Sequence, residues 1–397
     1  MTDLDVVLFG ATGFVGRLVA EHLARSAPAG SRIGLAGRSK DKLEAVRDGL
    51  GRDWPLLVVD ANDPGALVDS ARVVCTTVGP YARYGWPLVE ACARTGTHYV
   101  DLTGEVLFHR RVIDELHDVA EASGARVVPS CGFDSVPSDL AVHLLAQQVQ
   151  EEGSGTLTGT TLVASMKGGI SGGTVDSLRA QVEQLAREPE RARLVDDPYA
   201  LSPDRAAEPD LGDEHDSRDI GRDSDGRWLG PFVMAQYNTR VVRRSNALTG
   251  WSYGRSFRYQ ERMSYGRSPL GPLLAAGGAA TIALAPRAFA LGPTRKALDA
   301  LLPDPGQGPG ERTRRNGWFR MDLDTVTTTG RRYRAVVAAK GDPGYAATAV
   351  MMGESALALA HDDLPARAGV LTPATAMGDA LAARLRQQGA ELSVAPG

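Results

Sequence analysis

The sequence predicts an α/β protein with an N-terminal doubly wound parallel sheet and a second α+β domain that contains a mixed or antiparallel sheet. Three observations support this prediction. A short apolar run near the N-terminus leads directly into three evenly spaced glycines. Continuous apolar runs then alternate with helical periods as far as residue 136, which is typical of parallel strands covered by helices on both faces. Beyond Pro137, longer runs with a period of two replace that alternation and favour antiparallel pairing.

The N-terminal segment carries a G-x-x-G-x-x-G motif between a strand and a helix. In that position the backbone N–H groups and the helix dipole stabilise a pyrophosphate. We expect Gly10 to permit the tight turn, Gly13 the close approach of the phosphates, and Gly16 the packing of helix on strand. Their neighbours Thr12, Phe14 and Val15 complete the predicted cofactor-binding loop. A plain strand–helix turn is the alternative.

Six predicted strands with helices between them match this Rossmann fold, in which ligands lie beyond the carboxyl ends of the strands. The strands are expected at Asp5–Phe9, Arg32–Ala36, Pro55–Asp60, Val73–Val78, His98–Leu102 and Arg126–Pro129. The helices are expected at Phe14–Arg25, Lys40–Gly49, Trp86–Thr95 and Phe108–Ser123. Together they predict a dinucleotide-binding domain over residues 1–136.

The second domain is predicted over residues 137–345. Longer strands are expected there at Thr158–Ser165, Thr239–Val242, Ser256–Met263 and Trp318–Thr328. Residues 346–397 contain two Ala/Leu-rich helical segments, Gly353–Ala360 and Thr372–Leu385. By analogy with two-domain reductases, we expect these helices to pack back on the first domain.

Three segments of the second domain are distinguished by their composition. Pro203–Arg227 is polar and is expected as an exposed excursion, and Pro303–Arg315 is a Pro/Gly-rich connector. Ser268–Pro286 contains no charged residue. Its length is close to that of a membrane span, although prolines and glycines interrupt it. A buried helix or hairpin, a lipid-facing element around Leu270–Leu291 and a true span all remain open.

The composition excludes several classes of function. A net charge of -4 argues against nucleic acid as a partner. The three cysteines, Cys75, Cys92 and Cys131, lack metal-ligand spacing and are expected as buried thiols of a reducing cytoplasm. The seven histidines include no H-E-x-x-H pair, so we predict no metal site. The acidic N-terminus leads straight into a strand, so we expect no secretory signal.

The residues after the second strand predict which dinucleotide binds. An enzyme selective for the unphosphorylated cofactor usually has Asp or Glu there, whereas this chain has Arg38 and Ser39, with Lys42 just beyond. A cation and a hydroxyl suit the 2′-phosphate of NADP. A cationic helix start without a ligand is the alternative. Asp60, at the end of the third strand, either bonds the adenine amine or caps the next helix.

The loops after the later strands are expected to meet at one crevice. Thr77 and Gly79 should pass beneath the second ribose and the nicotinamide, which brings Tyr81 and Tyr84 near the hydride. Three polar residues follow the sixth strand, and capping of the next helix is the favoured role for them: Asp134, Ser135 and Ser138. Lys167 opens a glycine-rich run that either binds an anionic or carbonyl group or simply turns.

These motifs together resemble the saccharopine dehydrogenase-like oxidoreductases. The resemblance rests on G-A-T-G-F-V-G (10–16), A-G-R-S (36–39), T-V-G-P-Y (77–81), D-L-T-G-E (101–105) and C-G-F-D-S-V-P-S-D (131–139). Further matches at 167–174, 240–248, 341–345 and 371–381 make the chain look most similar to the actinobacterial trans-acting enoyl reductase branch. The resemblance implies NADPH, a thioester-bound enoyl substrate, a polyketide synthase that lacks its own reductase, and a lipid pathway of wax or glycolipid synthesis.

Reduction of an enoyl thioester requires chiefly a donor for the developing oxyanion. Tyr81, Tyr84 and Lys167 are the candidate catalytic residues. A cluster of Arg240, Arg243 and Arg244 either meets an acidic acyl carrier domain or its phosphopantetheine phosphate, or forms a solvated strand edge.

Two other functions remain open. A saccharopine-type imine or amino-acid reductase predicts charged residues converging on the nicotinamide, and a non-catalytic lipid-associated scaffold predicts an outward apolar patch. The expected location is the cytoplasm. A peripheral contact at the inner face of the plasma membrane and a homodimer are both compatible with the sequence.

Overall fold

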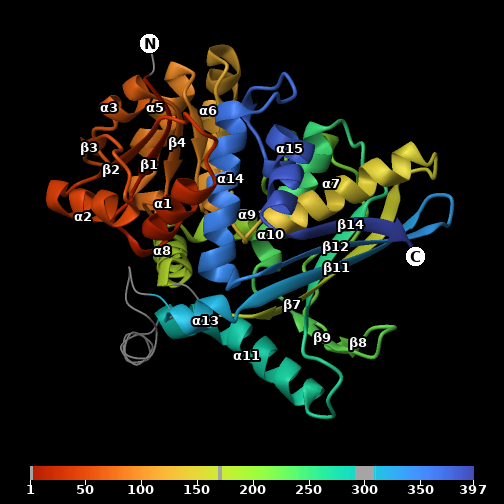
Figure 1. The fold of residues 1–397 in the computed structure, drawn as a ribbon. Helices are drawn as coiled ribbons and strands as arrows, with labels where there is room; N and C mark the ends of the chain where they lie inside the picture. The colour runs from red at the N-terminus through yellow and green to blue at the C-terminus, as the bar shows by residue number, and fades with distance from the viewer. Residues whose placement is uncertain (1–2, 169–171, 291–307, 309) are drawn as a thin grey trace.

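The computed structural model describes residues 3–168, 172–290, 308 and 310–397. Two seven-stranded sheets, A and B, organise the fold, and helix α14 stands between them (Figure 1). The strands of sheet A are β1 (Leu4–Phe9), β2 (Ile33–Gly37), β3 (Leu56–Val58), β4 (Ala71–Thr76), β5 (His98–Val100), β6 (Arg126–Val128) and β13 (Gly369–Val370). Those of sheet B are β7 (Leu157–Lys167), β8 (Gly221–Arg222), β9 (Trp228–Pro231), β10 (Arg258–Ser264), β11 (Trp318–Thr327), β12 (Arg332–Lys340) and β14 (Glu391–Pro396).

Helices cover both sheets. The helices of the first 151 residues are α1 (Phe14–Ser26), α2 (Lys40–Leu50), α3 (Gly65–Ser70), α4 (Tyr81–Tyr84), α5 (Trp86–Thr95), α6 (Val106–Ser123) and α7 (Val136–Glu151). Those that follow are α8 (Gly172–Arg187), α9 (Ala192–Asp196), α10 (Ala235–Leu248), α11 (Gly271–Ala290), α13 (Glu311–Arg315), α14 (Thr348–His361) and α15 (Pro373–Gln387). Two 3₁₀-helical turns, η1 (Pro189–Arg191) and η2 (Arg205–Ala207), and one π-helical turn, η3 (Pro343–Ala347), complete the described helices.

Sheet A is entirely parallel, with the order β13-β6-β5-β4-β1-β2-β3. The chain leaves the central strand β1 toward β2 and β3, then returns to the other side of β1 through β4. The point between β1 and β4 is therefore where the strand order reverses, and ligands of doubly wound sheets bind at that point. The predicted α/β class and parallel sheet are confirmed.

The last strand of sheet A was not predicted. β13 has two residues, too few to show a period, and it pairs with β6 from near the C-terminus. In the same segment, α14 packs on α1 and β4, so C-terminal residues complete the first sheet. One hydrophobic core runs from Leu8 of β1 through Leu357 of α14 to Met321 of β11, and a second contains Val7 of β1 and Val112 of α6.

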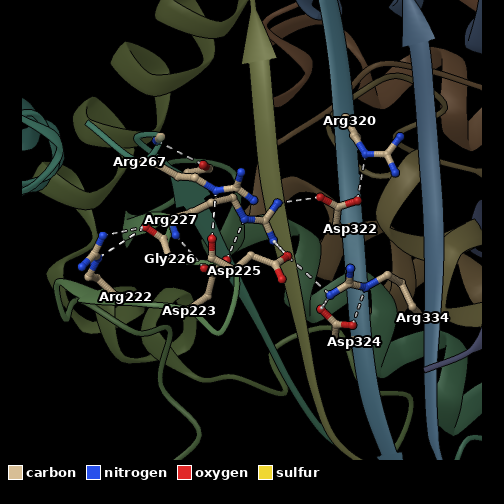
Figure 2. A network of polar contacts seen from close by, with 12 residues as sticks. Arg222, Asp223, Asp225, Gly226, Arg227, Arg267, Arg320, Asp322, Asp324 and Arg334 are labelled. Carbon is tan, nitrogen blue, oxygen red and sulfur yellow. Dashed lines mark hydrogen bonds and ion pairs between the residues drawn. The ribbon is translucent and has the colours of Figure 1, made fainter. Parts of the chain in front are cut away.

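Sheet B is mixed, as predicted, with the order β14-β12-β11-β7-β10-β9-β8. Only β7 and β10 pair in parallel, and the other neighbours are antiparallel. Helices α7 and α10 pack on one face. The opposite face carries polar side chains, including a network of arginines and aspartates (Figure 2). There Arg227 bonds Asp223 (2.7 Å) and Asp322 of β11 (2.6 Å), and Arg320 bonds the other oxygen of Asp322 (2.9 Å). The predicted excursion Pro203–Arg227 is thus tied down at its end.

The predicted strand Thr239–Val242 is wrong, because these residues lie in helix α10. The β-branched pair Val241-Val242 suggested a strand, but tertiary packing overrides that weak preference.

The arginines beside this valine pair are buried and donate to backbone carbonyls. Arg244 donates to Leu201 O (2.8 Å) and Val370 O (2.6 Å), and burial lowers its pKa to about 9. Arg240 pairs with Asp216 (2.7 Å) and Arg243 donates to Tyr259 O (3.0 Å). Neither a carrier contact nor a solvated strand edge fits these three arginines.

The charge-free run Ser268–Pro286 lies largely in helix α11, which follows the lower edge of the molecule in Figure 1. Its leucines are exposed, so the expectation of a buried helix or hairpin is wrong. No helix among the described residues is both long and apolar enough to span a bilayer. In the predicted connector Pro303–Arg315, residues 303–307 and 309 lie outside the described residues, and its end forms α13.

Candidate dinucleotide site

A cleft of about 300 Å³ opens at the carboxyl end of sheet A, where the strand order reverses. Its walls are the loops that follow β1, β2, β3 and β4, together with α4. The lining residues are Phe9, Gly10, Thr12, Gly13, Gly37, Arg38, Asp60, Ala61, Asn62, Thr77, Val78, Gly79 and Tyr84. Seven of these belong to the predicted site, namely Gly10, Thr12, Gly13, Arg38, Asp60, Thr77 and Gly79, and an eighth, Tyr84, was predicted as catalytic.

The glycine loop has the geometry that a close backbone approach requires. Gly10 has φ +87°, and a Cβ there would lie 2.7 Å from Thr77 Oγ1 and 2.9 Å from Val78 Cγ2. A Cβ on Gly16 would overlap the Gly10 carbonyl oxygen and lie 2.8 Å from its carbon. Helix α1 begins with Gly13 as its N-cap and has no side-chain cap. The N–H groups of its first turn, including those of Phe14 and Val15, are therefore left without a capping side chain, next to Gly13, which lines the cleft.

The cationic side of the cleft follows β2. Arg38 is exposed and, within the described chain, has no ion pair. Ser39 is the N-cap of α2 but makes no side-chain cap bond, and Lys42 is exposed on the first turn of α2. A guanidinium, a hydroxyl and an ammonium group are thus available where the ribose of a dinucleotide lies in this fold.

Asp60 lines the cleft from the loop that follows β3. Its Oδ1 accepts from the backbone and side-chain amides of Asn62, both at 2.9 Å. Because α3 begins only at Gly65, Asp60 shapes the loop after β3 rather than capping that helix.

The two tyrosines of α4 have different surroundings. Tyr81 is 4% exposed, and its hydroxyl donates to Thr76 O (3.1 Å) and accepts from Leu102 N (3.1 Å). Burial holds its pKa well above the ordinary value. Tyr84 is 45% exposed and lines the cleft. Its hydroxyl has no hydrogen-bond partner in the part of the chain that the structure describes. Tyr84 can therefore reach a ligand, whereas Tyr81 joins the ends of two strands.

Glu105 fixes the position of α4. Its carboxylate accepts the backbone N–H of Tyr81 (2.9 Å) and of Ala82 (2.8 Å), two of the groups that a helix N-terminus leaves without intrahelical partners. Asp101 acts similarly on the neighbouring loops, because its Oδ1 accepts from Thr103 N (2.9 Å) and Ser130 N (2.8 Å). Burial raises the pKa of Asp101 to about 6. The sequence motif D-L-T-G-E predicted that these residues lie at this edge of the sheet. Only the hydrogen bonds in the structure show that the two carboxylates hold α4 and the neighbouring loops in place.

Lys167 is exposed at the end of β7 and is not among the residues that line the cleft. The end of β7 packs against η3, and η3 in turn packs against the first residue of α1, next to the glycine loop. A Cβ on Gly168 would lie 2.6 Å from Pro343 Cδ, and Tyr345 of η3 stacks edge-on against Phe14 with ring centroids 4.9 Å apart. The predicted caps after β6 are not made: Ser135 is the N-cap of α7 without a side-chain bond, and Ser138 Oγ accepts from Asn238 instead (3.3 Å).

These features fit a bound dinucleotide. Side chains at Gly10 or Gly16 would fill the turn, the first turn of α1 lacks a side-chain cap, and a cation without an ion pair lines the cleft.

Comparison with known proteins identifies the same region. Residues 6–128 match the NADP-binding domain of saccharopine dehydrogenase. A Mycobacterium tuberculosis protein provisionally named a trans-acting enoyl reductase is 50% identical over 98% of this chain and 97% of its own. The trans-acting enoyl reductase of Mycobacterium ulcerans is 49% identical over 98% of this chain and 97% of its own.

Solved structures share the fold at low identity. Saccharopine dehydrogenase (L-Glu forming) of Saccharomyces cerevisiae superposes with a TM-score of 0.57 at 15% identity, covering 99% of both chains. Homospermidine synthase of Legionella pneumophila, solved with NAD, superposes with a TM-score of 0.53 at 9% identity, covering 100% of this chain and 92% of its own. At these identities the two likenesses establish the architecture alone.

Proposed function

The chain belongs to the trans-acting enoyl reductase family, and we propose that it uses NADPH to reduce a carbon–carbon double bond in an acyl thioester held on a carrier protein. It is an NADP-dependent oxidoreductase with the saccharopine dehydrogenase type of nucleotide domain. The observation that carries the proposal is the cleft at the β1/β4 reversal, where the glycine turn and Arg38 suit a phosphorylated dinucleotide.

In the proposed reaction, bound NADPH supplies the hydride that adds to the β-carbon of the enoyl group. Negative charge then develops on the thioester carbonyl oxygen, which needs a positioned hydrogen-bond donor. We assign that role to the Tyr84 hydroxyl, which is exposed in the cleft. The Glu105 carboxylate positions it by holding the first turn of α4. A proton delivered to the α-carbon by this hydroxyl or by water completes the reduction.

For Lys167 we propose a contact with the carrier instead of a catalytic role. The register of sheet B pairs Trp318 with Lys167 on one side and with Lys340 on the other. Neighbouring strands lie about 4.8 Å apart, and directly paired residues share a face. Trp318 is exposed, and the exposed residues Lys167 and Lys340 are its partners on the two neighbouring strands. Such a row suits the phosphate of a phosphopantetheine arm and the acidic surface of a carrier domain.

The experiment compares one enoyl group on two carriers. The protein and NADPH are mixed with a 2-enoyl thioester of acyl carrier protein or of N-acetylcysteamine, which lacks the phosphate. NADPH consumption and product mass are recorded. The proposal predicts reduction of both, with a lower KM for the carrier-bound form. Lys167→Glu should raise the KM for the carrier-bound thioester and leave the KM for the N-acetylcysteamine thioester unchanged. Binding of NADPH without reduction of either thioester would refute the proposed reaction.

The saccharopine-type alternative receives less support. A substrate with several charges needs charged side chains around the reacting carbon. Among the described residues that line the cleft, the charged ones are Arg38 and Asp60, which follow β2 and β3 at the ribose side. We therefore favour an uncharged acyl substrate, and we extend the proposal to a lipid-synthesis pathway supplied by a polyketide synthase.

A further inference from the structure

Helix α11 reverses the usual arrangement of a surface helix. Such helices bury large apolar residues and expose polar ones. Here small residues face the protein. A Cβ on Gly271 would lie 2.8 Å from Trp228 Cγ, and one on Gly278 would lie 2.8 Å from Tyr265 Cζ. Ala275, between them on the same face, is fully buried. Because the small residues pack closely on Trp228 and Tyr265, they occupy the inner face of the helix, and the leucines lie on its outer face.

The outward face of α11 carries exposed leucines as far as its side chains are described, to residue 285. Leu273 is 71% exposed, Leu274 55% and Leu284 57%, and Leu270 just before the helix is 63% exposed. The other large exposed apolar side chains in the described residues are scattered over separate elements, whereas these four follow one helix. A contiguous apolar face of this kind marks a contact surface.

The charges around α11 indicate what the contact is. From residue 262 to residue 290 the sequence contains three arginines and no aspartate or glutamate, although the whole chain has a net charge of -4. Arg267 precedes the exposed leucines, and no aspartate or glutamate stands between it and the end of the helix in the sequence. Apolar residues that follow a cation, in a stretch without acids, match the surface of an anionic bilayer. We infer that α11 lies in the interface of an anionic membrane and attaches the protein to it.

This placement connects the membrane with the candidate site. α11 packs on α8, and Glu183 of α8 pairs with Arg83 of α4, the helix that carries Tyr84. The attached helix is thus joined through α8 to the helix that carries Tyr84. The attachment stands on α11 alone and is tested without cofactor or substrate, so its failure and that of the proposed reaction are distinguishable.

The test is flotation of the full chain with vesicles of phosphatidylcholine alone or mixed with phosphatidylglycerol. We expect the protein to float with the mixed vesicles and at least tenfold less with the neutral ones. The double variant L273S/L274S should lose at least tenfold in partitioning, whereas Val326→Ser, an exposed apolar site on β11, should not. NADPH affinity reports that each variant is folded.

Two results would overturn the inference. One is a wild-type protein that stays in solution with both kinds of vesicle. The other is a self-associated wild type that L273S/L274S converts to monomer without any change in flotation, which would make α11 a contact between copies of this chain.

Discussion

Substitution of Gly16 by alanine tests the dinucleotide cradle at its tightest point. The new Cβ would overlap the Gly10 carbonyl oxygen and lie 2.8 Å from its carbon and 3.0 Å from Ala11 Cα, all of them backbone atoms that no rotamer change can move aside. Helix α1 must therefore move away from the turn after β1. We expect a loss of roughly 1–3 kcal/mol in unfolding free energy from overpacking. We also expect at least about tenfold weaker NADPH binding, since the first-turn N–H groups move with the helix.

Urea unfolding and a fluorescence titration with NADPH measure the two effects. Gly49→Ala is the matched control, because a Cβ there meets nothing within 4 Å. It lies within α2, where alanine is favoured over glycine by up to about 1 kcal/mol, so stability should stay constant or rise. Unchanged affinity and stability in Gly16→Ala would refute the close packing of helix on turn and, with it, the cradle.

Four further substitutions test the remaining parts. Arg38→Glu should weaken NADPH binding at least about tenfold and leave NADH binding nearly unchanged, and equal losses in paired titrations would remove the 2′-phosphate role. Tyr84→Phe should lower kcat roughly 10²-fold at constant NADPH affinity. Tyr81→Phe should chiefly lower the free energy of unfolding, because it removes two hydrogen bonds of a buried hydroxyl. Steady-state kinetics and urea unfolding of both variants distinguish the two effects. Burial raises the pKa of Asp139 to about 6, so the folded state holds that proton more tightly than the unfolded chain and stability should fall as pH rises from about 4 to 6. Asp139→Asn should flatten that slope by up to about 1.4 kcal/mol per pH unit in urea unfolding at several pH values, and an unchanged slope would exclude this group.

The sequence predicted the elements whose pattern is local. The strand–glycine–helix order at Gly10–Gly16 gave the turn, and alternating apolar strands and helices gave the parallel sheet. Most of the residues expected at the cofactor line one cleft, because strand ends in a parallel sheet converge at one edge.

Other features depend on contacts between distant segments, which a local pattern does not contain. β13 takes its place beside β6 only when the chain returns from near its C-terminus. The guanidinium of Arg244 is buried, and the carbonyl oxygens of residues 201 and 370 accept its hydrogen bonds. Its position next to other arginines in the sequence suggested an exposed cluster instead. The anchoring role of Glu105 likewise appears only from its bonds to residues 81 and 82.

The measurement that tests the central claim most directly is transfer of deuterium from NADPH labelled at the nicotinamide C4 to a carrier-bound 2-enoyl thioester. The account predicts a saturated product with one deuterium at the β-carbon, formed by the wild type and roughly 10²-fold more slowly by Tyr84→Phe. Mass spectrometry of the released acyl chain locates the label. Recovery of unreduced enoyl thioester from protein saturated with NADPH and carrier would contradict the account.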